Sequence, residues 1–155
     1  MGFINPIKKN INNDNNQPQT IKTVSNTMRK KRSDKKHTTK FPVDHILAVR
    51  LKTACKQLNR YRNEQHLPAM TQTEFNTKLL ETGLSRMELI DYSLPYKDTK
   101  QYMQTKLLES EYQSSIAGPY GIAVRMNLSE RKVVYFIVHS ILLHIERGGN
   151  IEEII

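Results

Sequence analysis

The chain has 155 residues, enough for one domain with a modest core and too few for most multidomain enzymes. Its net charge of +9 indicates an anionic partner such as nucleic acid. The single cysteine excludes an internal disulfide and a thiol cluster for zinc or iron–sulfur binding. The sequence shows no apolar run long enough for a signal peptide or a membrane span, so we expect a cytoplasmic protein with no membrane partner.

The positive charge is concentrated near the N-terminus. Residues 1–40 carry ten lysines and arginines against two aspartates, a net charge of +8, which leaves +1 for the rest. This stretch is rich in Asn and has no apolar period, so we predict that residues 1–35 form a disordered basic arm. Such an arm would increase the affinity for nucleic acid, because lysine and arginine release counterions from the phosphates that they contact. The alternative is a tail that only increases solubility. The predicted phosphate contacts in the arm are Arg29, Lys30, Lys31, Arg32 and Lys35.

The first predicted strand spans residues 36–41 and stops at Pro42, because Thr and Phe favour the pleat and proline cannot continue a central ladder. Side chains alternate along a strand, so Phe41 and the residues two and four positions before it share the core face. The opposite face carries three polar side chains suited to hydrogen-bonding base edges: Lys36, Thr38 and Lys40.

Helical patterns follow this strand. Apolar residues three and four positions apart predict a helix over 43–64, with Cys55 on the apolar stripe as a buried thiol. A capping box, Thr71 to Glu74, predicts the start of a second helix, with Gly83 as a stop signal near its end. We expect a helical connector over 85–120, including a helix over 98–114 and a turn at its end.

The C-terminal part, residues 121–155, is predicted to be a second strand–helix unit or a dimerisation element. Alternation over 122–126 predicts a strand whose outer face carries Ala123 and Arg125, the candidates for a second ribbon. A cap pattern beginning at Asn127 then opens a helix that runs to Arg147. This helix is apolar around most of its circumference, so we expect it to be buried against the first unit or against a second chain.

The order strand, long helix, loop and capped helix within residues 36–84 is similar to the ribbon-helix-helix family of DNA-binding proteins. The resemblance rests on residues 38–42, 46–58 and 71–84. It implies a mainly α fold with a short β ribbon, tandem or dimeric, in which two antiparallel strands enter the major groove. The partner strand would come from a second chain, in a homodimer, or from residues 122–147. It also implies base contacts by Lys36, Thr38 and Lys40, and phosphate held by the backbone amides of Thr71 and Gln72.

At the level of whole proteins, the chain looks like plasmid-encoded accessory factors of conjugation, which bind a transfer origin (oriT) in the relaxosome and assist a relaxase. The alternatives are a plasmid-encoded transcriptional repressor of the same fold, an RNA-binding factor, and a helical protein-interaction module with a non-specific nucleic-acid tether. No motif of a cofactor, metal or catalytic site appears in the sequence, so we expect no enzyme and no cofactor. We assign Tyr92, Tyr96 and Tyr102 to packing, and we expect no metal site at His139 and His144 because their spacing turns them apart.

Overall fold

The computed structural model describes Gly2 and residues 32–154. The chain divides into two units, residues 1–30 and 31–155, and the helices and strands described below all belong to the second. This unit is mainly helical and contains a two-stranded antiparallel sheet, in agreement with the predicted fold class. Most of the predicted arm falls outside the described residues, and so do three of its predicted phosphate contacts, Arg29, Lys30 and Lys31.

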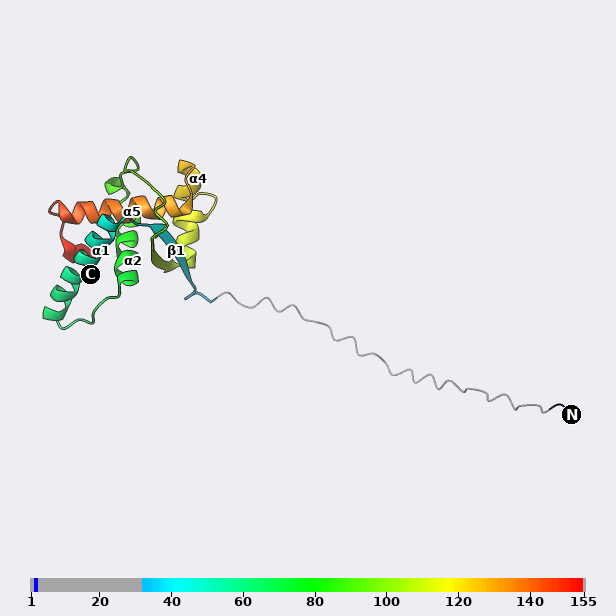
Figure 1. Cartoon of the computed structure of the whole chain (residues 1–155), viewed down its shortest axis with the longest axis horizontal. Coiled ribbons are helices and arrows are strands. Elements are labelled where there is room, and N and C mark those ends of the chain that lie inside the picture. Colours follow the sequence, from blue (N-terminus) through cyan, green and yellow to red (C-terminus); the bar gives the residue numbers. More distant parts are fainter. Residues whose placement is uncertain (1, 3–31, 155) are drawn as a thin grey trace. The chain divides into compact units, whose positions relative to one another are not determined.

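Each of the two strands is followed by helical segments (Figure 1). The first half of the unit holds β1 (Lys36–Pro42), α1 (His45–Glu64), α2 (Gln72–Ser85) and a 3-10 turn (Met87–Leu89). The second half holds β2 (Tyr102–Leu108), α3 (Glu109–Tyr112), a π-helical turn (Gln113–Ala117), α4 (Ile122–Met126), α5 (Glu130–Glu146) and a 3-10 turn (Ile151–Ile154). The order strand, helical segment, helix therefore occurs twice.

The strand and the two helices predicted for the first half are confirmed, with small shifts in the bounds. β1 extends to Pro42, and α1 begins after Asp44, whose carboxylate accepts a hydrogen bond from the Leu47 amide at 2.6 Å. α2 begins with the predicted capping box. The Glu74 amide donates to Thr71 Oγ1 at 3.2 Å, and the Thr71 amide donates to the Glu74 carboxylate at 2.7 Å. Local sequence signals therefore place these elements.

Gly83 does not stop α2, which continues to Ser85. A Cβ atom at position 83 would lie 2.3 Å from Ile137 Cγ2 of α5, closer than side chains pack in proteins. The glycine is therefore needed for the close approach of α2 to α5, and its role is packing rather than termination.

The predicted helix over 98–114 is wrong. Residues 102–108 form the strand β2, and α3 with the π-helical turn accounts for the helical part. Met103 and Leu107 are four residues apart, a spacing that fits one face of a helix and one face of a strand equally well. Pairing with β1 decides between the two, because it supplies a ladder partner for each backbone. Thr105 and Leu107 are then buried on alternate positions.

The strand predicted over 122–126 is also wrong, because these residues form the short helix α4. Gly121 is its N-cap and Asn127 ends it in the left-handed conformation, with φ 52°. Five alternating residues cannot distinguish a strand from a helical turn that is buried on one side. Ala123 is buried and Arg125 is exposed on a helix, so neither belongs to a second ribbon. The cap of α5 is Ser129, two residues after Asn127.

The sheet is completed within one chain. β1 pairs antiparallel with β2, from Lys36 opposite Leu108 to Pro42 opposite Tyr102. The partner strand therefore comes neither from a second chain nor from residues 122–147, and the ribbon gives no reason to expect a homodimer. The outer edge of β2 is covered by α2, whose Asn76 side chain donates to the Gln104 carbonyl at 3.3 Å.

The core lies between the sheet and the longer helices. α5 lies across α1 and α2 (Figure 1), and nine of its residues are buried. It packs mainly against α2 and β1 of the first half, which confirms one of the two predicted partners for this helix. Cys55 is a buried core residue as predicted, and burial raises the pKa of its thiol. Arg50 of α1 pairs through two guanidinium nitrogens with Glu146 of α5.

Each half of the unit contributes a helix that packs against the strand of the other half. α2, from the first half, packs against β2, while α5, from the second half, packs against β1, and the two helices pack against each other. Thr39-Lys40-Phe41 and Thr105-Lys106-Leu107 occupy the fourth to sixth positions of their strands, and both triplets are buried, exposed and buried in that order. The two strands, with α2 and α5 packed on them, are therefore related by an approximate twofold axis through the paired Thr39 and Thr105, whereas α1 has no single counterpart in the second half.

Candidate nucleic-acid interface

The exposed face of the β1–β2 sheet is the first candidate surface. As predicted, Lys36, Thr38 and Lys40 share one face of β1, and all three are exposed. Two flanking bonds, from the Glu109 amide to the Lys35 carbonyl at 2.8 Å and from the Val43 amide to the Gln101 carbonyl at 2.9 Å, fix the phase of the ladder. Lys36, Thr38 and Lys40 are therefore at non-hydrogen-bonded positions of the ladder, where the side chains of paired residues lie closest to each other. Their partners are Leu108, Lys106 and Gln104.

The combined face is cationic and polar. Lys106 is exposed and Gln104 is half-buried, and both point to the same side as Lys40 because paired residues share a face. The two described strands contain three lysines and no carboxylate. Gln104 and Lys106 were missed at the sequence level because their strand was taken for a helix.

The N-terminus of α2 lies next to this face. A hollow between β2 and α2 is lined by three lysines and two carboxylates together with threonines and one leucine: Lys36, Lys78, Lys106, Glu74, Glu81, Thr71, Thr73, Thr77 and Leu108. The predicted phosphate contacts Thr71 and Gln72 are therefore placed beside the ribbon, but the Thr71 amide already donates to Glu74. Hydrogen bonds from the amide and hydroxyl of Thr71 lower the pKa of the Glu74 carboxyl. Of the two predicted amides, only that of Gln72 lies outside the capping box.

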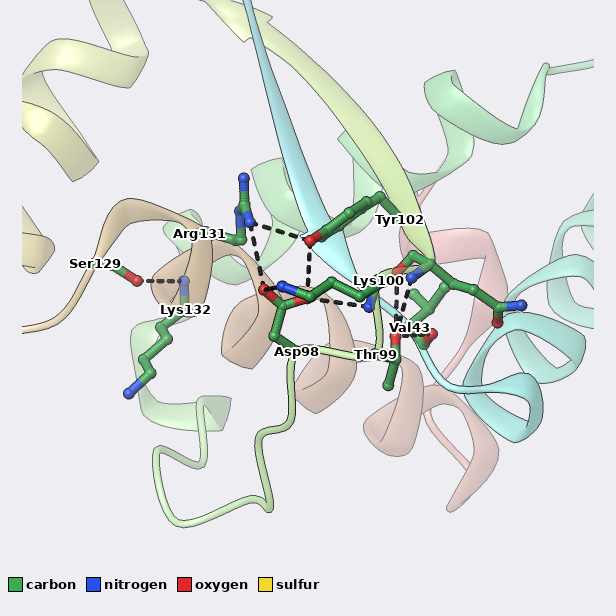
Figure 2. Close-up of polar contacts among 9 residues, drawn as sticks. Val43, Asp98, Thr99, Lys100, Tyr102, Ser129, Arg131 and Lys132 are labelled. Atoms are coloured by element: carbon green, nitrogen blue, oxygen red, sulfur yellow. Dashed lines mark hydrogen bonds and ion pairs between the residues drawn. The ribbon is translucent and has the colours of Figure 1, made fainter.

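The N-terminus of α5 lies beside β1. Arg131, in its first turn, lines a hollow with Thr38, Lys40 and Glu130. The Arg131 guanidinium lies 4.9 Å from the centre of the Tyr102 ring and 3.8 Å from the Asp98 carboxylate. Figure 2 shows these three side chains converging between α5 and β2. The hydroxyl of Tyr102 donates to Asp98 at 2.8 Å and lowers the pKa of that carboxyl.

Lys132 follows Arg131 and places a second cation in the first turn of α5. Its amide donates to the Ser129 hydroxyl at 3.3 Å (Figure 2), and its ammonium lies 5.1 Å from the centre of the Tyr96 ring. The helix dipole favours anions at this end, and the two cations add positive charge there, against the single carboxylate of Glu130 in the same turn. A serine cap followed by a glutamate and then two basic residues was the available sequence signal for this feature.

A polar layer lies beneath the exposed face of β1. The His37 ring stacks on Tyr112 at 3.8 Å between ring centres, and its Nδ1 lies 3.0 Å from the Glu109 carboxylate. Tyr112 donates its hydroxyl to Glu130, and burial raises the pKa of that hydroxyl. Two carboxylates near the ribbon are therefore engaged in internal contacts: Glu109 holds α3 to β1, and Glu130 holds α5 to α3.

Among residues 32–154, no group of three or more His, Cys, Asp and Glu side chains comes together as metal ligands. Within the same range, no helix is both long and apolar enough to cross a membrane. His139 contacts the Tyr135 hydroxyl at 3.2 Å, and burial lowers the pKa of its imidazole. Tyr92 and Tyr96 pack against the core as predicted, whereas Tyr102 is partly exposed.

Comparison of the chain with protein-family models, with curated proteins and with solved structures found no significant match.

Proposed function

We propose that this protein binds double-stranded DNA sequence-specifically by placing the exposed face of the β1–β2 sheet in the major groove, as a ribbon-helix-helix protein whose two halves lie in one chain. The observation that carries the proposal is the composition of that face. It presents Lys36, Thr38, Lys40, Gln104 and Lys106, and the two strands contain no carboxylate.

The dimensions and the chemistry of the ribbon suit the major groove. That groove admits a two-stranded β ribbon, and each base pair presents a distinct set of donors and acceptors in it. Lysine donates to O6 and N7 of guanine, threonine contacts the methyl group of thymine, and glutamine forms two bonds with adenine. The exposed face carries each of these side-chain types within two adjacent strands.

Phosphate contacts flank the ribbon on both sides in this proposal. The first turn of α2 offers the Gln72 amide beside β2, and the first turn of α5 offers Arg131 and Lys132 beside β1. The N-termini of α2 and α5, each the positive end of a helix dipole, lie beside different strands of the ribbon, so each would face one DNA strand across the groove. The basic residues from Arg29 to Lys35 would add affinity without sequence preference.

The biological role we favour is that of a cytoplasmic accessory factor at a plasmid transfer origin, acting with a relaxase. A plasmid-encoded repressor of the same fold would use the same surface, so the two roles differ in the position of the target rather than in the chemistry. An interaction module with a non-specific tether is the candidate from another class. The exposed apolar side chains near α4, Tyr120, Val124 and Met126, are the observation that favours it.

The test is a salt series of dissociation constants for a selected duplex and a scrambled duplex of equal length. Lys40→Ala should reduce the preference for the selected duplex by about 1 to 3 kcal/mol, the loss expected for one base contact. Lys56→Ala is the matched control, because Lys56 is an exposed lysine on α1, outside the ribbon. A protein that binds both duplexes equally, with affinity that follows salt alone, would be a non-specific tether.

A further inference from the structure

The approximate twofold axis sets up a comparison between the two strands of the ribbon. It passes through the paired Thr39 and Thr105, so it exchanges Lys40 with Lys106 and Thr38 with Gln104. Lys40 and Lys106 have the same side chain, whereas Thr38 and Gln104 differ. The exposed face is therefore symmetric at one position of each strand and asymmetric at the next.

We infer that a single chain reads an imperfect inverted repeat, in which Lys40 and Lys106 select the same base in the two half-sites while Gln104 selects adenine in only one of them. This inference rests on the proposed function and deepens it. It makes Gln104 the residue that distinguishes the half-site read by β2 from the half-site read by β1.

The surroundings of Gln104 suit such a role. Its backbone carbonyl accepts a hydrogen bond from Asn76, which fixes the strand to α2, and its side chain shares a hollow with Lys40 and Tyr102. A glutamine amide can donate to N7 and accept from N6 of adenine, and so forms two bonds with that base alone. Thr38, at the exchanged position, has one hydroxyl and one methyl group and cannot form this pair.

A further difference lies at the ends of the strands. The axis exchanges Lys36 with Tyr102, and the hydroxyl of Tyr102 donates to Asp98 while Arg131 lies over its ring. Lys36 is exposed and lines the hollow beside α2. Only the β1 half-site therefore receives an outer lysine contact.

A second chain is not needed to complete the reading surface. The outer edge of β2 is bonded to α2, since the Lys106 amide donates to the Thr77 hydroxyl at 2.8 Å and Asn76 donates to the Gln104 carbonyl. β1 packs against α5 on its own side. Because each strand of the ribbon already has a helix along it, one chain can occupy one DNA site.

The experiment compares the full-length wild type with Gln104→Thr, which makes positions 38 and 104 identical. Each protein is used to select duplexes from a random library, and mass measurement of the complex gives the number of chains per duplex. The wild type should select a non-palindromic site as one chain per duplex. Gln104→Thr should select a more symmetric site and bind the wild-type site about tenfold more weakly. Gln57→Thr, an exposed change on α1, should leave the selected site unchanged.

The outcomes separate this inference from the proposed function. If the wild type selects a palindrome, binds as two chains per duplex, or keeps its base preference in Gln104→Thr, the inference is overturned while sequence-specific DNA binding stands. If the wild type selects no sequence, both fail. Thermal unfolding of each variant by circular dichroism, expected to match the wild type, shows that the comparison is made between folded proteins.

Discussion

The contact between α2 and α5 at Gly83 gives a quantitative prediction for Gly83→Ala. The added Cβ would meet Ile137 Cγ2 at 2.3 Å and Ile141 Cγ1 at 3.1 Å, and both isoleucines are fully buried. Overpacking of this kind costs about 1 to 3 kcal/mol. Replacing a glycine inside a helix by alanine gains about 1 kcal/mol. We expect a net loss of about 0 to 2 kcal/mol in the free energy of unfolding, and not the full gain of about 1 kcal/mol that the helix propensity alone would give.

Urea unfolding of the two single variants and of the double variant tests this reasoning. Ile137→Ala alone removes a buried side chain and should cost about 2 to 5 kcal/mol. It also removes the methyl group that the new Cβ meets, so the double variant should lose less than the two single changes added together. If Gly83→Ala raises stability by the full helix-propensity gain, and the two changes add without coupling, the close approach of α2 to α5 is refuted.

Three further predictions concern single side chains. Thr71→Ala removes the capping box with Glu74 and should lower the free energy of unfolding by about 1 kcal/mol, as measured in urea. Tyr102→Phe should raise the pKa of Asp98, as measured in an NMR titration, because it removes the hydroxyl that lowers this pKa in the folded protein. In the wild type the Asp98 carboxylate therefore stabilises the fold above the pKa of an unfolded aspartate, about 3.9. This contribution is lost as the pH falls through the lower pKa of Asp98 in the folded protein. Cys55 should react with a thiol reagent at neutral pH only as fast as the protein opens, so a rapid reaction in the native state would contradict its burial.

The first half of the domain could be predicted from the sequence because each of its elements carries a local signal. Proline sets the end of β1, and a threonine with a glutamate three residues later sets the start of α2. The long helix over 130–146 was also found, because its apolar run exceeds the length of a strand. Its partner remained open until the structure placed it mainly against α2 and β1.

The errors fall where a signal is short or depends on distant residues. The sequence favours a helix over β2 because the spacing of Met103 and Leu107 fits the periods of both a helix and a strand. Only the pairing with β1, which lies far earlier in the chain, decides between them. α4 was taken for a strand because its five residues alternate by chance, although Gly121 and Asn127 are ordinary helix boundaries. Tertiary contacts therefore determined the elements that local periodicity could not.

Only part of the candidate site could be predicted from the sequence. Lys36, Thr38 and Lys40 were placed correctly on one exposed face, because alternation from buried Phe41 fixes that face. Lys106 and Gln104 were missed together with their strand. The repeated triplet of threonine, lysine and an apolar residue at 39–41 and 105–107 was the signal that could have revealed both strands and their relation.

Methylation interference on a selected duplex tests the central claim, reading of the major groove by the ribbon, most directly. N7 of guanine lies in the major groove, whereas N3 of adenine lies in the minor groove. The account predicts that N7 methylation of guanines at the centre of the site blocks binding by the wild type, that N3 methylation of adenines there is tolerated, and that Lys40→Ala loses the N7 effect in one half-site. Binding that tolerates N7 methylation throughout the site, or that is blocked by N3 methylation instead, would contradict the account.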